Sequence, residues 1–177
     1  MDTPIIIDFF KNFNSKDAQD ITFEQLADLI RSDEELKKSY DHLTSIRGIG
    51  IVNASAMIAY TNNFKNITTS RKLSSYYGIA PFREQSGTSV NKKAMVKCYS
   101  SSMLRAYLTQ AAENTIREHG IYHDYYRRLS ERGKCHGIAL NNVKNKLLHL
   151  SVSLIANDMD YEENHEFLRT IRKVQST

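Results

Sequence analysis

The stretch SIRGIGIVNASAMIAY, residues 45–60, decides the architecture of this chain. Gly48 and Gly50 separate two apolar patterns with helical spacing, one ending near Ile46 and the other beginning directly after the turn. Glycine allows the backbone to turn sharply, and a small residue such as Ala54 lets the second helix approach closely. The stretch therefore predicts two helices joined by a tight glycine turn.

Helical patterns continue on both sides of this turn. Only two prolines and seven glycines occur, and they fall between the periodic segments, which is typical of a mostly α-helical protein. Thr22 with Gln25, and Ser32 with Glu35, have the spacing of capping boxes, so we expect helices to start there. Apolar periodicity predicts further helices over about 104–116, 122–132, 138–156 and from 161 onward, with Gly133 ending the second of them.

Charge is distributed unevenly along the chain. Residues 1–42 hold five Lys/Arg against ten Asp/Glu, residues 43–149 hold sixteen against five, and residues 150–177 hold three against five. The central block, at +11, points to a polyanionic partner, because basic side chains gain most where they neutralise phosphates and release counterions. A solvated basic face is the alternative that charge alone leaves open.

The glycine turn resembles a helix-hairpin-helix motif, with Gly48, Ile49, Gly50 and the small Ala54 at the matching positions. In this motif, backbone N–H groups at the start of the second helix point at a DNA phosphate without reading base sequence. Arg47 would add positive charge beside them. A turn that merely joins two packed helices would carry the same glycines, so the motif alone leaves both interpretations open.

A second candidate site lies in the polar turn QSG, residues 85–87. Ser86 would be exposed at the apex of a loop, where Gly87 allows a substrate backbone to approach closely. Positive side chains placed around it would hold the charge of a phosphoryl-transfer transition state; these are Arg83, Lys92, Lys93 and Lys97. On spacing alone, an ordinary surface loop is the alternative.

The order of several motifs suggests a family. LTSIRGIGIVNASAMIAYTNNF, RKLSSYYGIAPFREQSG, MLRAYLTQAA, YYRRLSERGK and ALNNVKNKLL follow one another between Leu43 and Leu148. This order resembles the C-terminal transposase domain of the DEDD-type insertion-sequence transposases, the IS110/IS116/IS902 type. The resemblance implies DNA transposition by strand cleavage and exchange, with Ser86 as the nucleophile that becomes linked to DNA. It also makes Leu104 and Arg105 the family's Leu-Arg pair, with Arg105 as a DNA-binding residue.

The resemblance further implies groups that lie outside this chain. Full-length members carry an N-terminal RuvC-like domain whose four carboxylates bind magnesium, and no residue before Leu43 resembles it. We therefore expect no metal or cofactor in this chain, with Mg²⁺ needed only in that domain, and no cleavage by the chain alone. His119 and His123 lack a third ligand nearby in the sequence. The expected partners are DNA, a guide RNA from the element and further copies of the chain.

The sequence thus predicts a mostly α protein with a helical connector over residues 1–42, a compact multi-helix domain with the helix-hairpin-helix over 43–157, and a helical tail over 158–177. No apolar run reaches the roughly 20 residues that span a bilayer, and the start lacks the features of a signal peptide. We therefore expect a cytoplasmic protein without a membrane partner. Two alternatives stay open: a non-catalytic helix-hairpin-helix DNA-binding module that does not need Ser86, and an interaction fragment that dimerises through residues 22–43.

Overall fold

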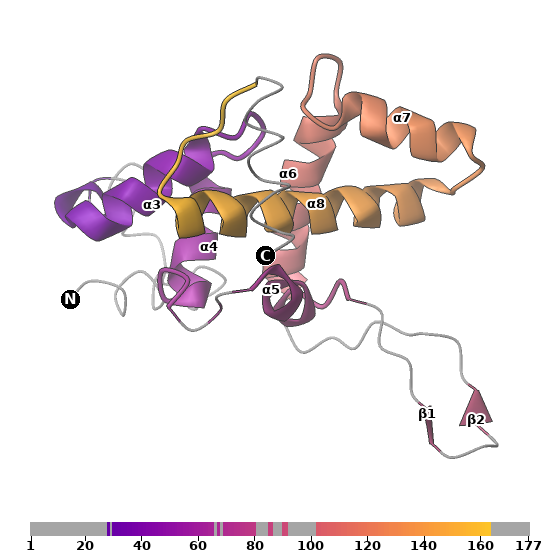
Figure 1. The fold of residues 1–177 in the computed structure, drawn as a ribbon, viewed down its shortest axis with the longest axis horizontal. Helices are drawn as coiled ribbons and strands as arrows, with labels where there is room; N and C mark the ends of the chain where they lie inside the picture. Colours follow the sequence, from indigo (N-terminus) through magenta and orange to yellow (C-terminus); the bar gives the residue numbers. More distant parts are fainter. Residues whose placement is uncertain are drawn as a thin grey trace, which may run out of the picture.

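The computed structural model describes residues 28, 30–65, 67, 69–80, 85–86, 90–91 and 102–163. This part of the chain is mostly α-helical, as the sequence predicts. Figure 1 shows its elements, which are α3 (Glu34–Thr44), α4 (Ile51–Thr61), α5 (Ser70–Tyr76), β1 (Gln85–Ser86), β2 (Val90–Asn91), α6 (Ser102–Ile116), α7 (His123–Glu131) and α8 (His136–Asn157).

Helix α8 is the centre of the arrangement. It packs against α3, α5, α6 and α7, and Figure 1 shows it running across the helical body with α6 crossing it. Buried side chains recur along α8 every three or four residues, at Val143, Leu147, Leu150 and Leu154. This periodicity predicts a helix over about 138–156, and the structure confirms it with slightly wider bounds.

Helix α3 begins one residue later than its capping-box pattern predicts. The cap is Asp33 in place of Ser32, and its carboxylate accepts hydrogen bonds from the backbone N–H groups of Glu35 at 2.9 Å and Leu36 at 3.1 Å. An aspartate at this position satisfies N–H groups and also places negative charge at the positive end of the helix dipole. These two effects of the carboxylate explain why Asp33, and not Ser32, is the N-cap of α3.

The main core crosses the expected boundary between connector and domain at residue 42. Leu36 and Tyr40, before that boundary, belong to the same buried cluster as Leu43, Ile46 and Met57 after it. Residue 42 itself lies inside α3. Residues on both sides of this position thus share one core, and the division into connector, domain and tail stays a prediction.

Helices α7 and α8 both end with the chain in a left-handed conformation. After α7, Gly133 has φ +76°, its N–H donates to Ser130 O at 2.9 Å, and Lys134 N–H donates to Leu129 O at 3.1 Å. This confirms the predicted stop at Gly133. After α8, Asp158 has φ +51°, and Met159 N–H donates to Leu154 O at 3.1 Å. The chain consequently changes direction at Asp158.

The segment expected as a polar turn around Ser86 contains a short strand pair. β1 and β2 are antiparallel, with Gln85 opposite Asn91 and Ser86 opposite Val90. Figure 1 shows this pair lying outside the helical body. Two short antiparallel segments can pair their backbone groups in this way. The sequence does not predict this pairing, because apolar alternation is scarce in it.

Within the described residues, no helix combines the length and the apolar character needed to cross a membrane.

Candidate nucleic-acid interface

The two glycines in the turn between α3 and α4 differ in backbone conformation and in steric surroundings. Gly48 has φ +111°, and a Cβ at this position would lie 2.8 Å from Thr115 Cγ2 on α6. Both the backbone angle and the contact exclude a side chain. Gly50 is extended, with φ −96°, and among the described atoms a Cβ there would meet nothing within 4 Å. Gly48 is thus needed for packing, whereas Gly50 is exposed and sterically free.

Helix α4 begins with an uncapped positive end. Gly50 is its N-cap, and no side chain of the described residues caps the helix at this end. The first turn, Ile51 to Asn53, contains no carboxylate. The first N–H groups of a helix have no partner within the helix and carry the positive end of its dipole. The start of α4 is therefore suited to an anion.

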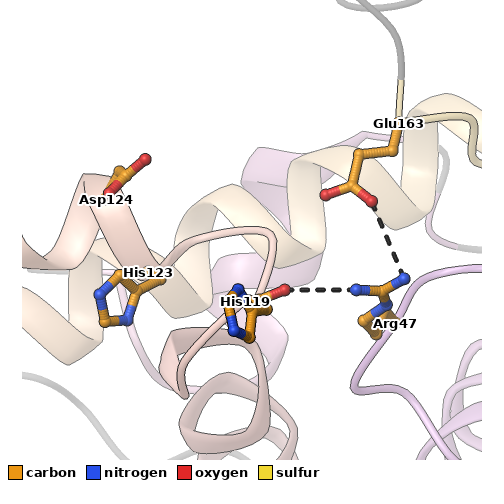
Figure 2. Close-up of a pocket in the computed structure, with 6 residues that line it drawn as sticks. Arg47, His119, His123, Asp124 and Glu163 are labelled. Atoms are coloured by element: carbon orange, nitrogen blue, oxygen red, sulfur yellow. Dashed lines mark hydrogen bonds and ion pairs between the residues drawn. The ribbon is translucent and has the colours of Figure 1, made fainter.

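Arg47 lies three residues before Gly50, the N-cap of this helix. Its guanidinium donates to the carbonyl oxygen of His119 at 3.4 Å and lies 3.9 Å from the carboxylate of Glu163, as Figure 2 shows. The side chain of Arg47 is 66% exposed. Because both contacts are long and exposed to water, they hold the guanidinium weakly. Arg47 is therefore available to an external anion.

A hollow of about 510 Å³ opens beside Arg47. Figure 2 shows most of its lining, which consists of Arg47, His119, Gly120, His123, Asp124 and Glu163. His123 Nδ1 lies 2.9 Å from the carbonyl oxygen of Ile116. Since a carbonyl only accepts, this nitrogen carries a proton and donates it to the carbonyl. Both signs of charge line the hollow, so its surface is mixed and not simply cationic.

The α6–α7 turn, which contains His119 and leads into His123 at the start of α7, depends on Gly120. A Cβ at Gly120 would lie 2.3 Å from the backbone oxygen of Thr115, and this oxygen accepts the N–H of Tyr122 at 2.9 Å. Thr115 thus contacts both turns, through its methyl group at Gly48 and through its carbonyl at Gly120. From the sequence, His119 and His123 were weighed only as possible metal ligands. The contacts of both turns with Thr115 on α6 explain why the two histidines lie near Arg47.

Ser86 is the last residue of β1, where the structure describes its backbone. The other expected residues of this site, which are Arg83, Gly87, Lys92, Lys93 and Lys97, lie outside the described residues. The nucleophilic role of Ser86 therefore stays a prediction.

Arg105 lies in the first turn and a half of α6, where it is half-buried. Its positive charge affects the pKa of Lys144 on α8. Burial lowers the pKa of the Lys144 ammonium, Glu113 opposes this shift, and Arg105 adds to it. Lys144 thus lies within electrostatic reach of a second cation, Arg105, and of the Glu113 carboxylate. The sequence gives no hint of Lys144, because its proximity to Arg105 depends on how α6 and α8 pack.

The tyrosines of α7 lie in a second core cluster. Tyr122, Tyr125 and Tyr126 pack, partly buried, against a cluster formed by Ala112, Leu140 and Val143. Tyr122 also donates to Lys146 O at 3.2 Å. Packing between α6, α7 and α8 is therefore their observed role, in agreement with the apolar stripe predicted for this segment.

A metal site is not formed by the part of the chain that the structure describes. No three His, Cys, Asp or Glu side chains in that part come together in an arrangement that could hold a metal ion. His123 uses one ring nitrogen for Ile116, and the side chain of His119 is 86% exposed.

Comparison with known proteins places these features in a family. A pilin gene-inverting protein from Moraxella lacunata is 24% identical over 144 residues, which are 80% of this chain and 45% of that protein. An insertion element IS110 uncharacterized 43.6 kDa protein from Streptomyces coelicolor is 26% identical over 120 residues, which are 68% of this chain and 29% of that protein. The chain thus spans less than half the length of these curated relatives.

The region with the family signature contains the turn and helix start described above. Residues 40–127 match the family described as Transposase IS116/IS110/IS902 family. They include the α3–α4 turn, β1, β2 and α6. By this match, the chain belongs to the Transposase IS116/IS110/IS902 family.

Proposed function

We propose that this chain is the DNA-binding segment of an insertion-sequence transposase or recombinase, equivalent to the C-terminal domain of the DEDD-type enzymes. In this proposal, the α3–α4 turn acts as a helix-hairpin-helix that contacts the DNA backbone. The observation that carries it is the start of α4, where exposed Gly50 leaves the helix without a side-chain cap from the described residues. Arg47 stands beside this start with long, weak contacts.

The physical basis is the chemistry of phosphate. Backbone N–H groups at a helix start, with the helix dipole behind them, bind a phosphate oxygen without reading a base. An arginine beside them adds a charged donor that suits phosphate geometry. The name of the Moraxella relative says that it inverts a pilin gene, and inverting a gene requires a protein that handles duplex DNA. Both lines of support favour the DNA backbone as ligand.

Ser86 is the proposed nucleophile. Its Oγ would give up its proton and bond to the phosphorus of the scissile phosphate. The bond from phosphorus to the leaving sugar oxygen would break, and that oxygen would take up a proton. The proposal rests on the family and on the position of Ser86 beside Gly87 in the sequence. Magnesium would be held by carboxylates outside this chain and would stabilise negative charge on the phosphate. We propose further that a guide RNA and other copies of the chain take part.

The binding role is tested by two substitutions at one position. Gly50→Asp and Gly50→Asn both place a good N-cap side chain on α4, since nothing described blocks a Cβ there. The two variants differ in charge alone. We expect Gly50→Asp to bind a DNA duplex about tenfold more weakly than Gly50→Asn at low salt, because its carboxylate repels the phosphate.

The measurement is a titration of labelled duplex with the full chain over a range of salt concentrations. Arg47→Ala should lower the magnitude of the salt slope by about one, as expected for the loss of one phosphate contact. Equal affinities for Gly50→Asp and Gly50→Asn would show that the start of α4 does not contact phosphate. Absence of a salt slope in the unmodified chain would contradict any role in backbone binding.

The nucleophile is tested in a complete transposase that carries this segment. Ser86→Ala should abolish strand exchange while DNA binding persists, because a methyl group cannot attack phosphorus. Ser89→Ala, three residues away in the same stretch, is the matched control and should retain exchange. If Ser86→Ala keeps its exchange activity, the segment is a non-catalytic binding module.

A further inference from the structure

The chain beyond α8 folds back over the α3–α4 turn. We call residues 158–163, with the sequence DMDYEE, the acidic strap, since four of the six side chains are carboxylic acids. Figure 1 shows the yellow segment after α8 turning toward the end of α3. The left-handed backbone of Asp158, with φ +51°, produces this reversal. The acidic strap therefore meets the same region that precedes the start of α4.

The acidic strap contacts α3 through a series of charged and polar pairs. Lys38 Nζ lies 2.9 Å from the carboxylate of Asp158. The two ring nitrogens of His42 lie 3.0 Å from Asp158 and 2.7 Å from Asp160. Tyr161 N–H donates to Ser45 Oγ at 2.7 Å. With the pair between Arg47 and Glu163 at 3.9 Å, these contacts follow α3 into the glycine turn.

His42 is held as a cation by this arrangement. Burial of the imidazole opposes its charge, but hydrogen bonds to Asp158 and Asp160 outweigh this effect and raise the pKa of His42. Ionised carboxylates only accept hydrogen bonds, so a partner on each ring nitrogen requires the doubly protonated ring. Lys38 and His42 are four residues apart and share one face of α3. The strap thus covers a row of positive groups formed by Lys38, His42 and Arg47.

The carboxylates of the acidic strap are well exposed to water. The side chains of Asp158 and Asp160 are 64% and 65% exposed, and that of Glu163 is 61% exposed. Exposed ion pairs contribute little individually. A DNA backbone presents a phosphate charge at regular intervals and gains affinity by releasing counterions. Such a polyanion can replace the strap on the positive row.

We propose that the row Lys38–His42–Arg47 is a DNA-backbone contact surface that the acidic strap occupies in the free protein and leaves when duplex DNA binds. This inference rests on the proposed function, because it extends the phosphate contact of the α3–α4 turn along α3. The strap carboxylates stand in for phosphate groups. The strap therefore weakens the binding of DNA and sets a threshold for it.

The first test compares two variants with the same net charge. Asp158→Asn with Asp160→Asn removes the carboxylates that face His42, and asparagine suits the left-handed backbone at residue 158. The control is Asp28→Asn with Glu131→Gln, which removes two charges from exposed positions that pair with Arg31 and Arg127, outside the positive row and the strap. We expect the strap variant to bind a labelled duplex about fivefold more tightly than the control at low salt, a usual size for coupling between two binding events.

The second test follows the strap directly. Hydrogen exchange of the Tyr161 amide, which donates to Ser45 in the free protein, should become faster when duplex DNA is added. Lys38→Gln in the strap variant should lower the magnitude of the salt slope by about one, because Lys38 then contacts phosphate.

The outcomes separate this inference from the proposed function. If the unmodified chain and the strap variant both fail to bind duplex, the proposed function and the inference fall together. If duplex binds but the strap variant equals its control and the Tyr161 amide stays protected, the acidic strap only secures the end of α8. In that case the inference alone is overturned.

Discussion

The starts of α4 and α7 differ although both helices follow glycine turns that pack against Thr115. The first turn of α7 contains Asp124, whose carboxylate lies at the positive end of the helix dipole and pairs with Arg127 at 3.2 Å. The first turn of α4 contains no such group. The Asp124 carboxylate thus compensates the positive end of the α7 dipole, whereas the positive end of α4 has no carboxylate in its first turn. The difference teaches that a glycine turn alone does not make a phosphate site; the residues after it decide.

The largest expected effects come from the two crowded glycines. Gly48→Ala forces a side chain into φ +111° and against Thr115, and Gly120→Ala places a methyl group 2.3 Å from a backbone oxygen. We expect each to lower the free energy of unfolding by about 2–4 kcal/mol. Gly50→Ala should change it by less than about 0.5 kcal/mol, because Gly50 is extended and exposed. Urea unfolding monitored by circular dichroism measures all three.

A second substitution separates the two glycine contacts. Thr115→Ser removes the methyl group that Gly48→Ala would meet but leaves the backbone oxygen that Gly120→Ala would meet. We expect Thr115→Ser to recover about 1 kcal/mol in the Gly48→Ala background and nothing in the Gly120→Ala background. Equal recovery in both backgrounds would mean that the two turns do not meet Thr115 through different atoms.

Neutralising the acid of α7 should make its start resemble that of α4. Asp124→Asn removes the charge at the helix dipole and the pair with Arg127, so we expect a loss of about 0.3–1 kcal/mol in unfolding free energy. Duplex affinity should rise by no more than about twofold, since the hollow still contains Glu163. Glu131→Gln, which breaks the other pair of Arg127 at the far end of the helix, is the control. The gain in duplex affinity from Asp124→Asn should be smaller than the affinity ratio between Gly50→Asn and Gly50→Asp. A larger gain would mean that the start of α7, and not that of α4, is the stronger phosphate site.

The smallest expected effect is on pH dependence, which distinguishes the strapped α3–α4 region from the α6–α7 turn. The raised pKa of His42 means that its contribution to stability is complete below about pH 6.5 and is lost as pH rises through the folded-state value. Hydrogen bonds from His42 and Lys38 lower the pKa of Asp158, so the carboxylate side of the contact is lost only in acid, below about pH 4.

The urea midpoint from pH 5 to pH 8 measures this contribution. Lys38 and Asp41 on α3, and Asp158 and Asp160 on the strap, are the charged groups near His42. His42→Gln should flatten the profile, while Lys38→Gln should leave its direction unchanged. A profile that keeps its slope in His42→Gln would assign the pH dependence to another group.

Sequence patterns predicted most of the described helices because each depends on nearby residues, but helix α5 was not predicted. The apolar spacing of α6 and α8, the stop at Gly133 and the glycine turn before α4 are local features, and the structure confirms them. The start of α3 was predicted one residue early, at Ser32, because two neighbouring residues can both cap. The short pairing of β1 with β2 was not predicted, since two-residue strands leave no periodicity.

The candidate site was predicted only in part. Arg47, Gly48 and Gly50 follow from the motif, but nothing in the sequence separates Gly48, which packs on α6, from Gly50, which is free. The positive row on α3 was missed because Lys38 and His42 lie in a stretch whose net charge is negative. Their common role appears only when the strap, more than a hundred residues away in sequence, folds onto them.

The sequence by itself determined the helical class of the protein and the position of the glycine turn, because turn residues and apolar periodicity act locally. The order of its motifs carried the resemblance to the transposase family. The tertiary structure alone decided which of the two glycines is sterically free and which cations gather beside the start of α4. The reason is physical: burial, close contact with Thr115 and pairing with the acidic strap depend on which segments meet in space, and distance along the chain does not record this.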